Sequence, residues 1–143
     1  MRLTQREVIA ALRRHGYKLT PQRRAVIQVV TSSQDHLTPA TIHEKMRRVH
    51  PNIGLVTVYR TLEILAKLGL ICEVHAGGNC RSYTISTPQH HHHLICSNCG
   101  IVIDFTGHYL SGLERSLSKE SGFRIDSHLL EFVGLCQACQ KAT

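Results

Sequence analysis

The sequence has no tryptophan, and aromatic residues make up only 5% of its 143 positions. It also lacks any apolar run near the ~20 residues that a membrane-spanning helix needs, so we expect no membrane segment. Arg2, Arg6 and Glu7 stand where a secretory signal peptide would be apolar. We therefore expect a soluble cytoplasmic protein, whose cysteines stay reduced and available to metal ions.

Acidic residues are scarce in the first part of the chain. Residues 1–85 hold 13 Lys and Arg against 5 Asp and Glu, a balance of +8, whereas residues 86–143 hold 4 against 5, a balance of −1. The basic part predicts a polyanionic partner, most simply nucleic acid. The length allows two small domains, and a small domain with little core commonly needs a bound metal.

Two Cys-x-x-Cys pairs supply four thiolates, which is the full complement of a closed tetrahedral zinc site. The pairs are Cys96 with Cys99 and Cys136 with Cys139. The alternative is two redox-active or disulfide-bonded pairs, but that chemistry would need a thioredoxin-like helix after the first pair. Gly100 and a β-branched run follow instead, so we predict one structural zinc site.

A run of four histidines, from His90 to His93, stands just before the first cysteine pair. In an extended segment alternate side chains point to opposite faces, so His91 and His93 would share one face and His90 and His92 the other. One run can therefore serve two metal sites. The alternative is a solvated polyhistidine tract or a purification tag, although the run lies in mid-chain.

Capping signals predict the helices of the first part of the chain, at about residues 4–16, 20–30, 38–50 and 54–69. Thr4 and Glu7 form a capping box, and Thr20 and Thr38 each precede a proline at the first helical position. In the third helix we expect Val49 to face inward.

The fourth predicted helix has an apolar stripe made of Leu55, Val58, Leu62, Leu65 and Leu68. Thr57, Arg60 and Thr61 fall on the opposite side, with Tyr59 beside them. Hydroxyls, a tyrosine and an arginine near the start of a helix are typical of a reader of the DNA major groove. The alternative is an ordinary solvated helix face.

Period-2 alternation predicts strands at residues 70–75 and 81–86, joined by a turn at 76–79. Helices followed by a hairpin indicate a winged helix-turn-helix domain over residues 1–85. The polar stretch 86–90 is the expected hinge linker.

The remaining residues, 91–143, predict a ββαββ unit with strands at about 93–96, 101–105, 123–126 and 129–135 and a helix at 109–121. This unit has strand edges to cover and little core, so we expect a homodimer. The predicted fold class is α+β: a winged helix-turn-helix domain followed by a small α/β dimerisation domain with structural zinc.

Three motifs resemble those of the ferric uptake regulator family: Thr57-Val-Tyr-Arg60, the histidine run before Cys96-x-x-Cys99, and Cys136-x-x-Cys139. The resemblance covers nearly the whole chain. It implies a dimeric, metal-responsive bacterial transcription factor that binds double-stranded DNA.

Carried over by position, the resemblance implies DNA contacts by Lys18, Arg23, Tyr59 and Arg60, to which the helix pattern adds Thr57. It places a regulatory metal site at His36, His91, His93 and Asp104. A third site would use His90, His92 and His128. Nitrogen and oxygen donors suit Fe(II), Mn(II) and Zn(II) almost equally, so the ligand types do not identify the metal that binds.

Two positions depart from the family pattern, because Thr84 and Ser111 stand where acidic ligands are expected. Either the sites are weaker here or substitutes exist. Cys72 is one candidate, since zinc sensors of the family draw a ligand from that place and a thiolate favours zinc. Those sensors carry a second cysteine where Ser86 stands here. The alternative is that three residues of the predicted wing are ordinary residues and not metal ligands, namely Cys72, His75 and Cys80.

These features predict a metal-dependent repressor of metal uptake genes, of the iron type, acting on a palindromic operator. A zinc uptake regulator and a peroxide-sensing repressor are the alternatives. The zinc would hold the second domain together permanently, while a second ion at the hinge acts as a reversible latch. We expect no enzyme, because no glutamate stands in the His-Glu-x-x-His relation of a zinc hydrolase.

Overall fold

The computed structural model describes residues 2–76, 80–87 and 89–142. It divides into two compact units, Met1–Pro88 and Gln89–Thr143, and the division falls within the linker expected at residues 86–90. Most of the expected turn at 76–79 and the side chain of Cys80 lie outside the described residues. No described helix has both the length and the apolar character needed to cross a membrane.

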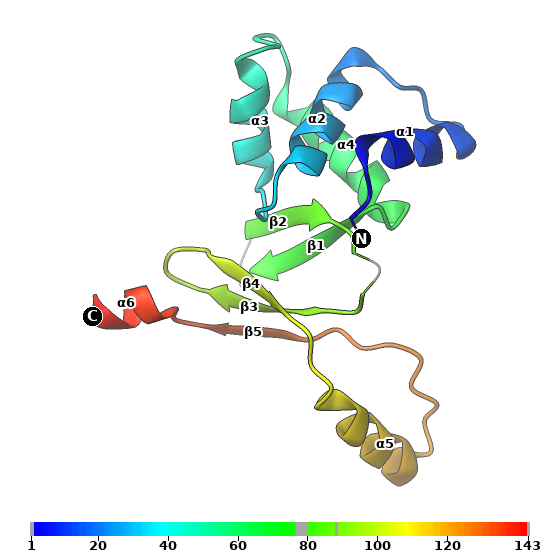
Figure 1. The fold of residues 1–143 in the computed structure, drawn as a ribbon, viewed down its shortest axis with the longest axis vertical. Coiled ribbons are helices and arrows are strands. Elements are labelled where there is room, and N and C mark those ends of the chain that lie inside the picture. The colour runs from blue at the N-terminus through cyan, green and yellow to red at the C-terminus, as the bar shows by residue number, and fades with distance from the viewer. Residues whose placement is uncertain (1, 77–79, 88, 143) are drawn as a thin grey trace. The chain divides into compact units, whose positions relative to one another are not determined.

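The first unit contains α1 (Gln5–Arg14), α2 (Pro21–Ser32), α3 (Pro39–Arg47), α4 (Leu55–Lys67), β1 (Ile71–Ala76) and β2 (Cys80–Ile85) (Figure 1). The predicted caps are confirmed. Thr4 Oγ1 accepts from the backbone N–H of Glu7 at 3.3 Å, and the Glu7 carboxylate accepts from the N–H of Thr4 at 2.6 Å. Thr20 and Thr38 cap α2 and α3 ahead of their prolines.

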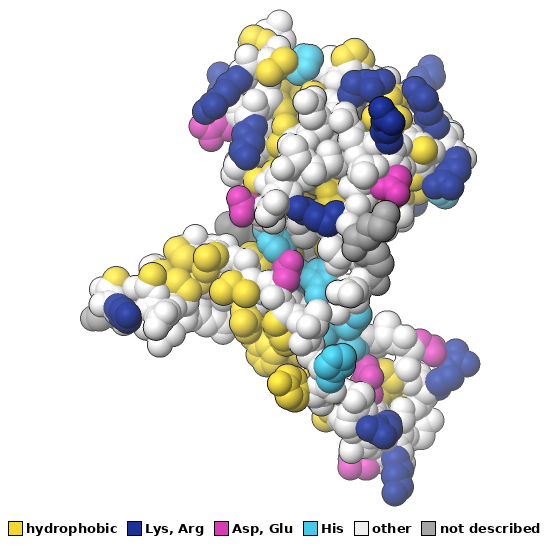
Figure 2. Space-filling model, viewed as in Figure 1, with side chains coloured by type: hydrophobic (Ala, Val, Ile, Leu, Met, Phe, Trp, Pro, Cys, Tyr) yellow, Lys and Arg dark blue, Asp and Glu magenta, His cyan; other side chains and the backbone are white. Residues whose placement is uncertain are grey.

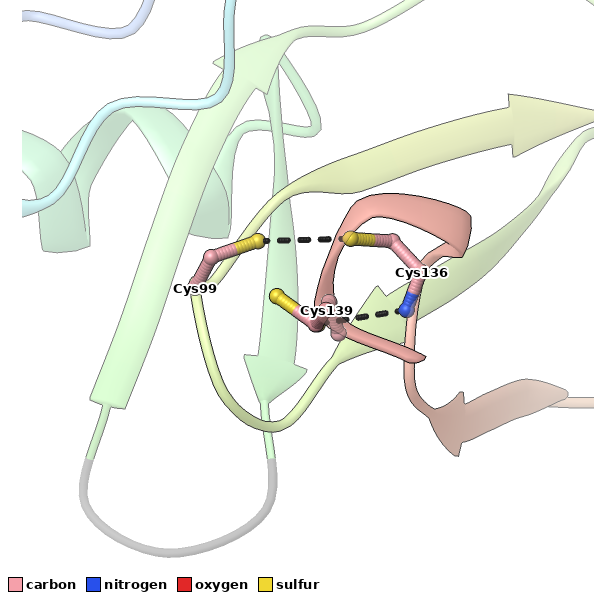
Figure 3. Close-up of side chains that lie close together, drawn as sticks. Cys99, Cys136 and Cys139 are labelled. Carbon is pink, nitrogen blue, oxygen red and sulfur yellow. Dashed lines mark hydrogen bonds between the residues drawn. The ribbon is translucent and has the colours of Figure 1, made fainter. Parts of the chain in front are cut away.

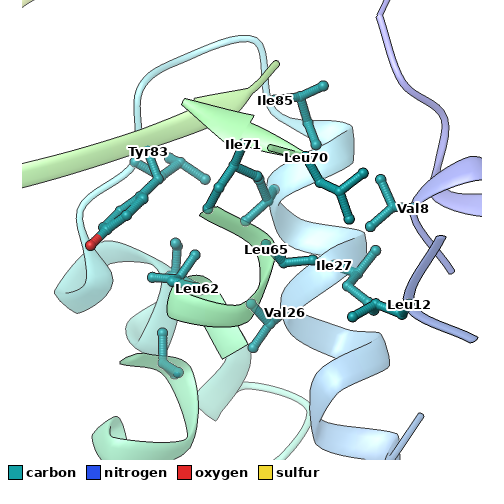
Figure 4. Close-up of a cluster of buried hydrophobic side chains, with 14 of the residues drawn as sticks. Val8, Leu12, Val26, Ile27, Leu62, Leu65, Leu70, Ile71, Tyr83 and Ile85 are labelled. Atoms are coloured by element: carbon teal, nitrogen blue, oxygen red, sulfur yellow. The ribbon is translucent and has the colours of Figure 1, made fainter. Parts of the chain in front are cut away.

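The core of the first unit lies among α1, α2, α3, α4 and the hairpin, and Figure 4 shows part of it. Its side chains are nearly inaccessible to solvent and include Val8, Leu12, Val26, Ile27, Leu62, Leu65, Leu70, Ile71, Tyr83 and Ile85. The apolar stripes of the helices therefore meet in one cluster, which fixes how α4 is presented at the surface.

Three expectations about individual side chains were wrong. Val49 is 75% exposed, because α3 ends at Arg47 and the helical periodicity does not reach it. Leu55 is 40% exposed at the first turn of α4. Thr61, expected at the surface, is only 2% exposed, and its hydroxyl donates to the Thr57 carbonyl at 2.8 Å.

β1 and β2 form an antiparallel hairpin in which Ile71 stands opposite Ile85. Leu37, just before α3, joins the hairpin through two backbone hydrogen bonds with Tyr83, each 2.8 Å long. The hairpin is thereby tied to the helices as a wing, and the predicted winged helix-turn-helix arrangement is confirmed.

The second unit contains β3 (His92–Cys96), β4 (Val102–Phe105), α5 (Leu110–Ser121), β5 (Glu131–Gly134) and α6 (Gln137–Lys141). The strand order is β4-β3-β5, with β4 antiparallel and β5 parallel to β3.

The expected strand at residues 123–126 was wrong. After Gly122 ends α5 in the left-handed region, with φ at 73°, residues 122–130 form no regular element. Arg124 and Asp126, which alternation would place on one strand face, instead form an ion pair at 2.8 Å. The stretch carries the chain from the end of α5 to β5, so the unit is ββαβα rather than ββαββ.

Exposed apolar side chains gather on one face of the three-stranded sheet. Ile103, Leu94 and Phe132 form a row across β4, β3 and β5, and they are 49%, 42% and 51% exposed. The amphipathic helix α5 buries no side chain, and its Leu113 and Leu117 are also exposed. Figure 2 shows this concentration of hydrophobic side chains over the second unit.

Candidate metal centres and nucleic-acid interface

The four cysteines of the two Cys-x-x-Cys pairs converge in the second unit, with their sulfur atoms all within 4.8 Å of one another. None of the four is in a disulfide bond, and Cys99 Sγ lies 3.7 Å from Cys136 Sγ. Sulfur ligands about 2.3 Å from a tetrahedral zinc are about 3.8 Å apart. Figure 3 shows the sulfurs of Cys99 and Cys136 facing each other, with Cys139 beside them. The donor set therefore fits zinc.

Local backbone geometry prepares this cluster for a metal ion. Gly100 has φ at 76°, a left-handed conformation that glycine adopts without strain, and it closes the turn that follows Cys99. The pKa of Cys96 is lowered to about 6, chiefly because the backbone N–H of Cys136 donates to its sulfur, and the N–H of Cys99 adds to this effect. A thiolate is the form that binds zinc.

The histidine run alternates between two faces, as predicted. The rings of His90 and His92 have centroids 4.7 Å apart, and those of His91 and His93 are 5.1 Å apart. The side chains of His90 and His92 also contact His128, which comes from the segment before β5. Two separate groups of imidazoles thus arise from one short stretch.

On one face, His93 lies between carboxylates of both neighbouring strands. Its Nε2 is 3.6 Å from Oδ1 of Asp104 on β4, and its Nδ1 is 3.8 Å from Oε1 of Glu131 on β5. Asp104 and Glu131 are the residues opposite His93 in the two strand pairs. The structure therefore brings His93 and Asp104 together, as expected, and adds Glu131, which the sequence reasoning missed.

On the other face, the three imidazoles of His90, His92 and His128 converge through their Nε2 atoms, and Nδ1 of His128 meets Glu114 of α5. Burial lowers the pKa of His92, and the neighbouring His90 and His128 lower it further. Neutral imidazole is the form that coordinates a metal. Glu114, which backs this cluster, was also missed from the sequence.

The wing brings together three of the residues singled out from the sequence. Cys72 stands opposite Thr84 in the hairpin register, and its Sγ is 3.5 Å from Oγ of Ser86. His75 Nε2 lies 3.7 Å from Oε1 of Glu73. His36 belongs to the first unit, in the segment before α3, and its part in a metal site stays a prediction.

The expected DNA-contacting residues lie mainly at the surface of the first unit. Tyr59 is 44% exposed and Arg60 is exposed on α4, whereas Thr57 is half-buried. Lys18 is exposed ahead of α2, and its carbonyl accepts a 2.7 Å hydrogen bond from Nη1 of Arg23. Arg23 therefore fixes the backbone at Lys18, in addition to any phosphate contact it makes.

A winged helix followed by a unit with clustered thiolates and imidazoles defines a metal-binding protein of the winged-helix class. Residues 14–133 match the profile of the Ferric uptake regulator family. The ferric uptake regulation protein of Campylobacter jejuni is 33% identical over 135 residues, which are 92% of this chain and 86% of that protein. The chain belongs to the ferric uptake regulator family.

Two further relatives differ in the role their names give them. The peroxide-responsive repressor PerR of Staphylococcus aureus is 33% identical over 134 residues, which are 94% of this chain and 90% of that protein. The ferric uptake regulator of Helicobacter pylori, described as having three functional metal binding sites, has a TM-score of 0.86 at 28% identity, covering 98% of this chain and 97% of that one. The relatives of this chain thus include proteins named for ferric uptake regulation and for the peroxide response.

Proposed function

We propose that this protein is a homodimeric, metal-dependent transcriptional repressor of the cytoplasm that binds a palindromic operator and controls metal uptake or homeostasis genes. The observation that supports it most is the position of His93 on β3, the first strand after the winged-helix unit, with its Nε2 3.6 Å from Oδ1 of Asp104 on β4. Metal donors at the junction of two units are what a switch needs, because an ion held by both can favour one mutual orientation.

The proposed DNA-reading element is α4. Tyr59 and Arg60 are exposed on it, and the buried stripe of Val58, Leu62 and Leu65 holds it against the core. Thr57 is close enough to the start of the helix to face the same groove. Lys18 would contact the minor groove and Arg23 a phosphate, and these charged contacts should make affinity fall steeply with salt.

The proposed regulatory ligands are His36, His91, His93 and Asp104. With His36 in the first unit and the others in the second, a shared divalent ion would act as the latch. Imidazole and carboxylate donors suit Fe(II), Mn(II) and Zn(II), and we favour Fe(II). The four cysteines would hold structural zinc permanently, because a closed four-thiolate site leaves no position for exchange with substrate.

The proposed dimer interface is the apolar sheet face together with the open side of α5. The row of Ile103, Leu94 and Phe132 continues into Ile101 and Leu135, which are also about half exposed. A second copy of the chain is the occupant that would cover this face, because a two-fold operator requires a two-fold protein.

The test is an anaerobic titration of the untagged protein on its own promoter DNA with Fe(II), Mn(II) and Zn(II). We expect metal to strengthen binding, and His36→Ala to remove that response. His15→Ala, which changes an exposed histidine at the end of α1, is the matched control and should respond normally. DNA binding that ignores every metal would refute the latch.

A second candidate function is peroxide sensing, favoured by the 33% identity to the S. aureus repressor. In that case iron held at the latch would promote oxidation of a neighbouring imidazole. Mass spectrometry of the Fe(II)-loaded protein after peroxide should then show added oxygen at His36 or His91. An unmodified chain would contradict peroxide sensing, and metal sensing would remain as the proposed function.

A further inference from the structure

The carbonyl group just before the proposed DNA-reading helix is held by a side chain of the preceding helix. Nε2 of His43, on α3, lies 2.8 Å from the carbonyl oxygen of Ile53, ten residues further along the chain. A carbonyl oxygen can only accept a hydrogen bond, so Nε2 must carry the proton and donate it. This bond ties α3 to the turn that leads into α4.

Both ends of the bond belong to well-packed parts of the first unit. His43 is half-buried and follows Ile42, which is inaccessible to solvent. Ile53 is only 8% exposed and lies in the same core, and its backbone N–H donates to the carbonyl of His50 at 3.1 Å. The peptide groups on both sides of Ile53 are therefore hydrogen-bonded, so the backbone that enters α4 has little freedom to move.

The helix α4 begins without the kind of cap that the three preceding helices have. Thr4, Thr20 and Thr38 cap α1, α2 and α3 through their hydroxyl groups. The N-cap of α4 is Gly54, and no described side chain caps this helix. Glycine also has more backbone freedom to lose than any other residue. The start of α4 therefore depends on restraint from outside the helix, and His43 supplies it at the neighbouring peptide group.

The first turns of α4 are the part that the proposed function directs at DNA. Val56 and Tyr59 are 61% and 44% exposed, and Arg60 is exposed beside them. The first buried side chain of the helix is Val58. Base recognition needs side chains held in one particular geometry, and a helix start that projects beyond the core is oriented by whatever fixes its first residues.

We propose that His43 is a positioning residue for DNA recognition: its Nε2–H holds the Ile53 carbonyl and thereby preorganises the start of α4 for the major groove. His43 acts through the backbone and does not itself touch a base. A preorganised helix start loses less conformational freedom when DNA binds, so affinity for the correct sequence rises. This inference rests on the proposed function, because it takes α4 as the reading element.

The experiment compares His43→Met with His43→Gln in the full chain saturated with Zn(II). Both new side chains are unbranched and of similar length, and Nε2 of glutamine stands as many bonds from Cα as Nε2 of histidine, but only glutamine has an N–H to donate. His43→Met should weaken binding to operator DNA about 2- to 12-fold, the effect of one net hydrogen bond, and should weaken binding to unrelated DNA much less. His43→Gln should keep most of the affinity for the operator.

The matched control is Val8→Ala, which shortens a fully buried side chain of α1, outside the turn between α3 and α4. It should lower the free energy of unfolding of the same unit and leave the ratio of operator affinity to unrelated-DNA affinity unchanged. A loss of general stability is thereby distinguished from a loss of positioning.

Two spectroscopic measurements do not depend on DNA. Imidazole nitrogen signals of His43 at alkaline pH should show a neutral ring protonated at Nε2. The amide of Thr57, which donates to the Gly54 carbonyl at 3.1 Å, should exchange with solvent faster in His43→Met and at the parent's rate in His43→Gln.

Several results would overturn the proposal and leave the proposed function intact. One is a neutral His43 ring protonated at Nδ1. Another is a His43→Met variant with the parent's affinity ratio, or equal losses from His43→Met and His43→Gln. A change of the ratio in Val8→Ala as large as that in His43→Met would also overturn it. A parent protein that binds operator and unrelated DNA alike would instead refute the proposed function, and this inference with it.

Discussion

Removing zinc from the four-cysteine cluster should unfold the second unit and leave the first unit folded. Among the described residues of the second unit, the buried apolar side chains are only Ile95 and Cys96, whereas the large hydrophobic cluster belongs wholly to the first unit. A unit of this size with so little core has no adequate apolar stabilisation of its own.

The magnitude follows from what the cluster would contribute. Structural zinc binding provides about 10–16 kcal/mol in small zinc-dependent folds at neutral pH. A small core alone rarely supplies more than about 3–5 kcal/mol. The free energy lost with the ion therefore exceeds the whole free energy of unfolding of the second unit. This holds even when a partner subunit covers part of that unit. Cys99→Ser should have nearly the same effect, because three thiolates and a hydroxyl bind zinc far more weakly.

Native mass spectrometry should count the zinc, and amide NMR spectra should show which unit loses its dispersed signals. Cys72→Ser is the matched control, since it removes a thiol outside the cluster and should leave the zinc in place. If chelated protein contains no zinc and still gives dispersed signals from β3 to β5, the assigned structural role of the metal is wrong.

Other predictions concern the remaining parts of the molecule. Tyr59→Ala should weaken binding to operator DNA more than to unrelated DNA, whereas Lys18→Ala should weaken both alike and reduce the salt slope by about one; equal losses from both variants would contradict the base-reading role of Tyr59. Leu94→Asp puts a charge in the apolar row of the sheet and should convert the dimer to a monomer in sedimentation; a surviving dimer would place the interface elsewhere. Leu62→Ala should lower the free energy of unfolding of the first unit by about 2–5 kcal/mol in urea denaturation, because Leu62 is fully buried. Val56→Ala, at a 61% exposed position of the same helix, should have almost no effect.

Local patterns predicted the helices and the wing well, because their signals lie within a few residues. The capping threonines Thr4, Thr20 and Thr38 marked helix starts that the structure places one residue later. Alternation along the histidine run likewise needs no distant partner, and it gave the correct division into two faces. The error at Val49 arose because helical spacing was continued beyond the end of α3. The error at Thr61 arose because the pattern was interpreted without knowing which side of α4 the core covers.

Contacts that depend on strand register were expected only where the family resemblance supplied them, as for His93 with Asp104. Phe123 and Ile125 alternate with polar residues as in a strand, but a strand also needs a partner, and Phe123 is 73% exposed. Glu131 meets His93 only because β5 pairs in parallel with β3 in one particular register. Glu114 could have been noticed as the nearest acidic residue on the helix face of Ser111, although its role on Nδ1 of His128 requires coordinates.

The contiguous histidines have a consequence for how this protein can diverge. Because neighbouring positions serve opposite sides, deleting His91 would bring the imidazole of His90 onto the side of His93. A two-residue deletion would keep the sides and lose one donor from each site. Substitutions can thus tune the two sites one at a time, but length changes here alter both at once.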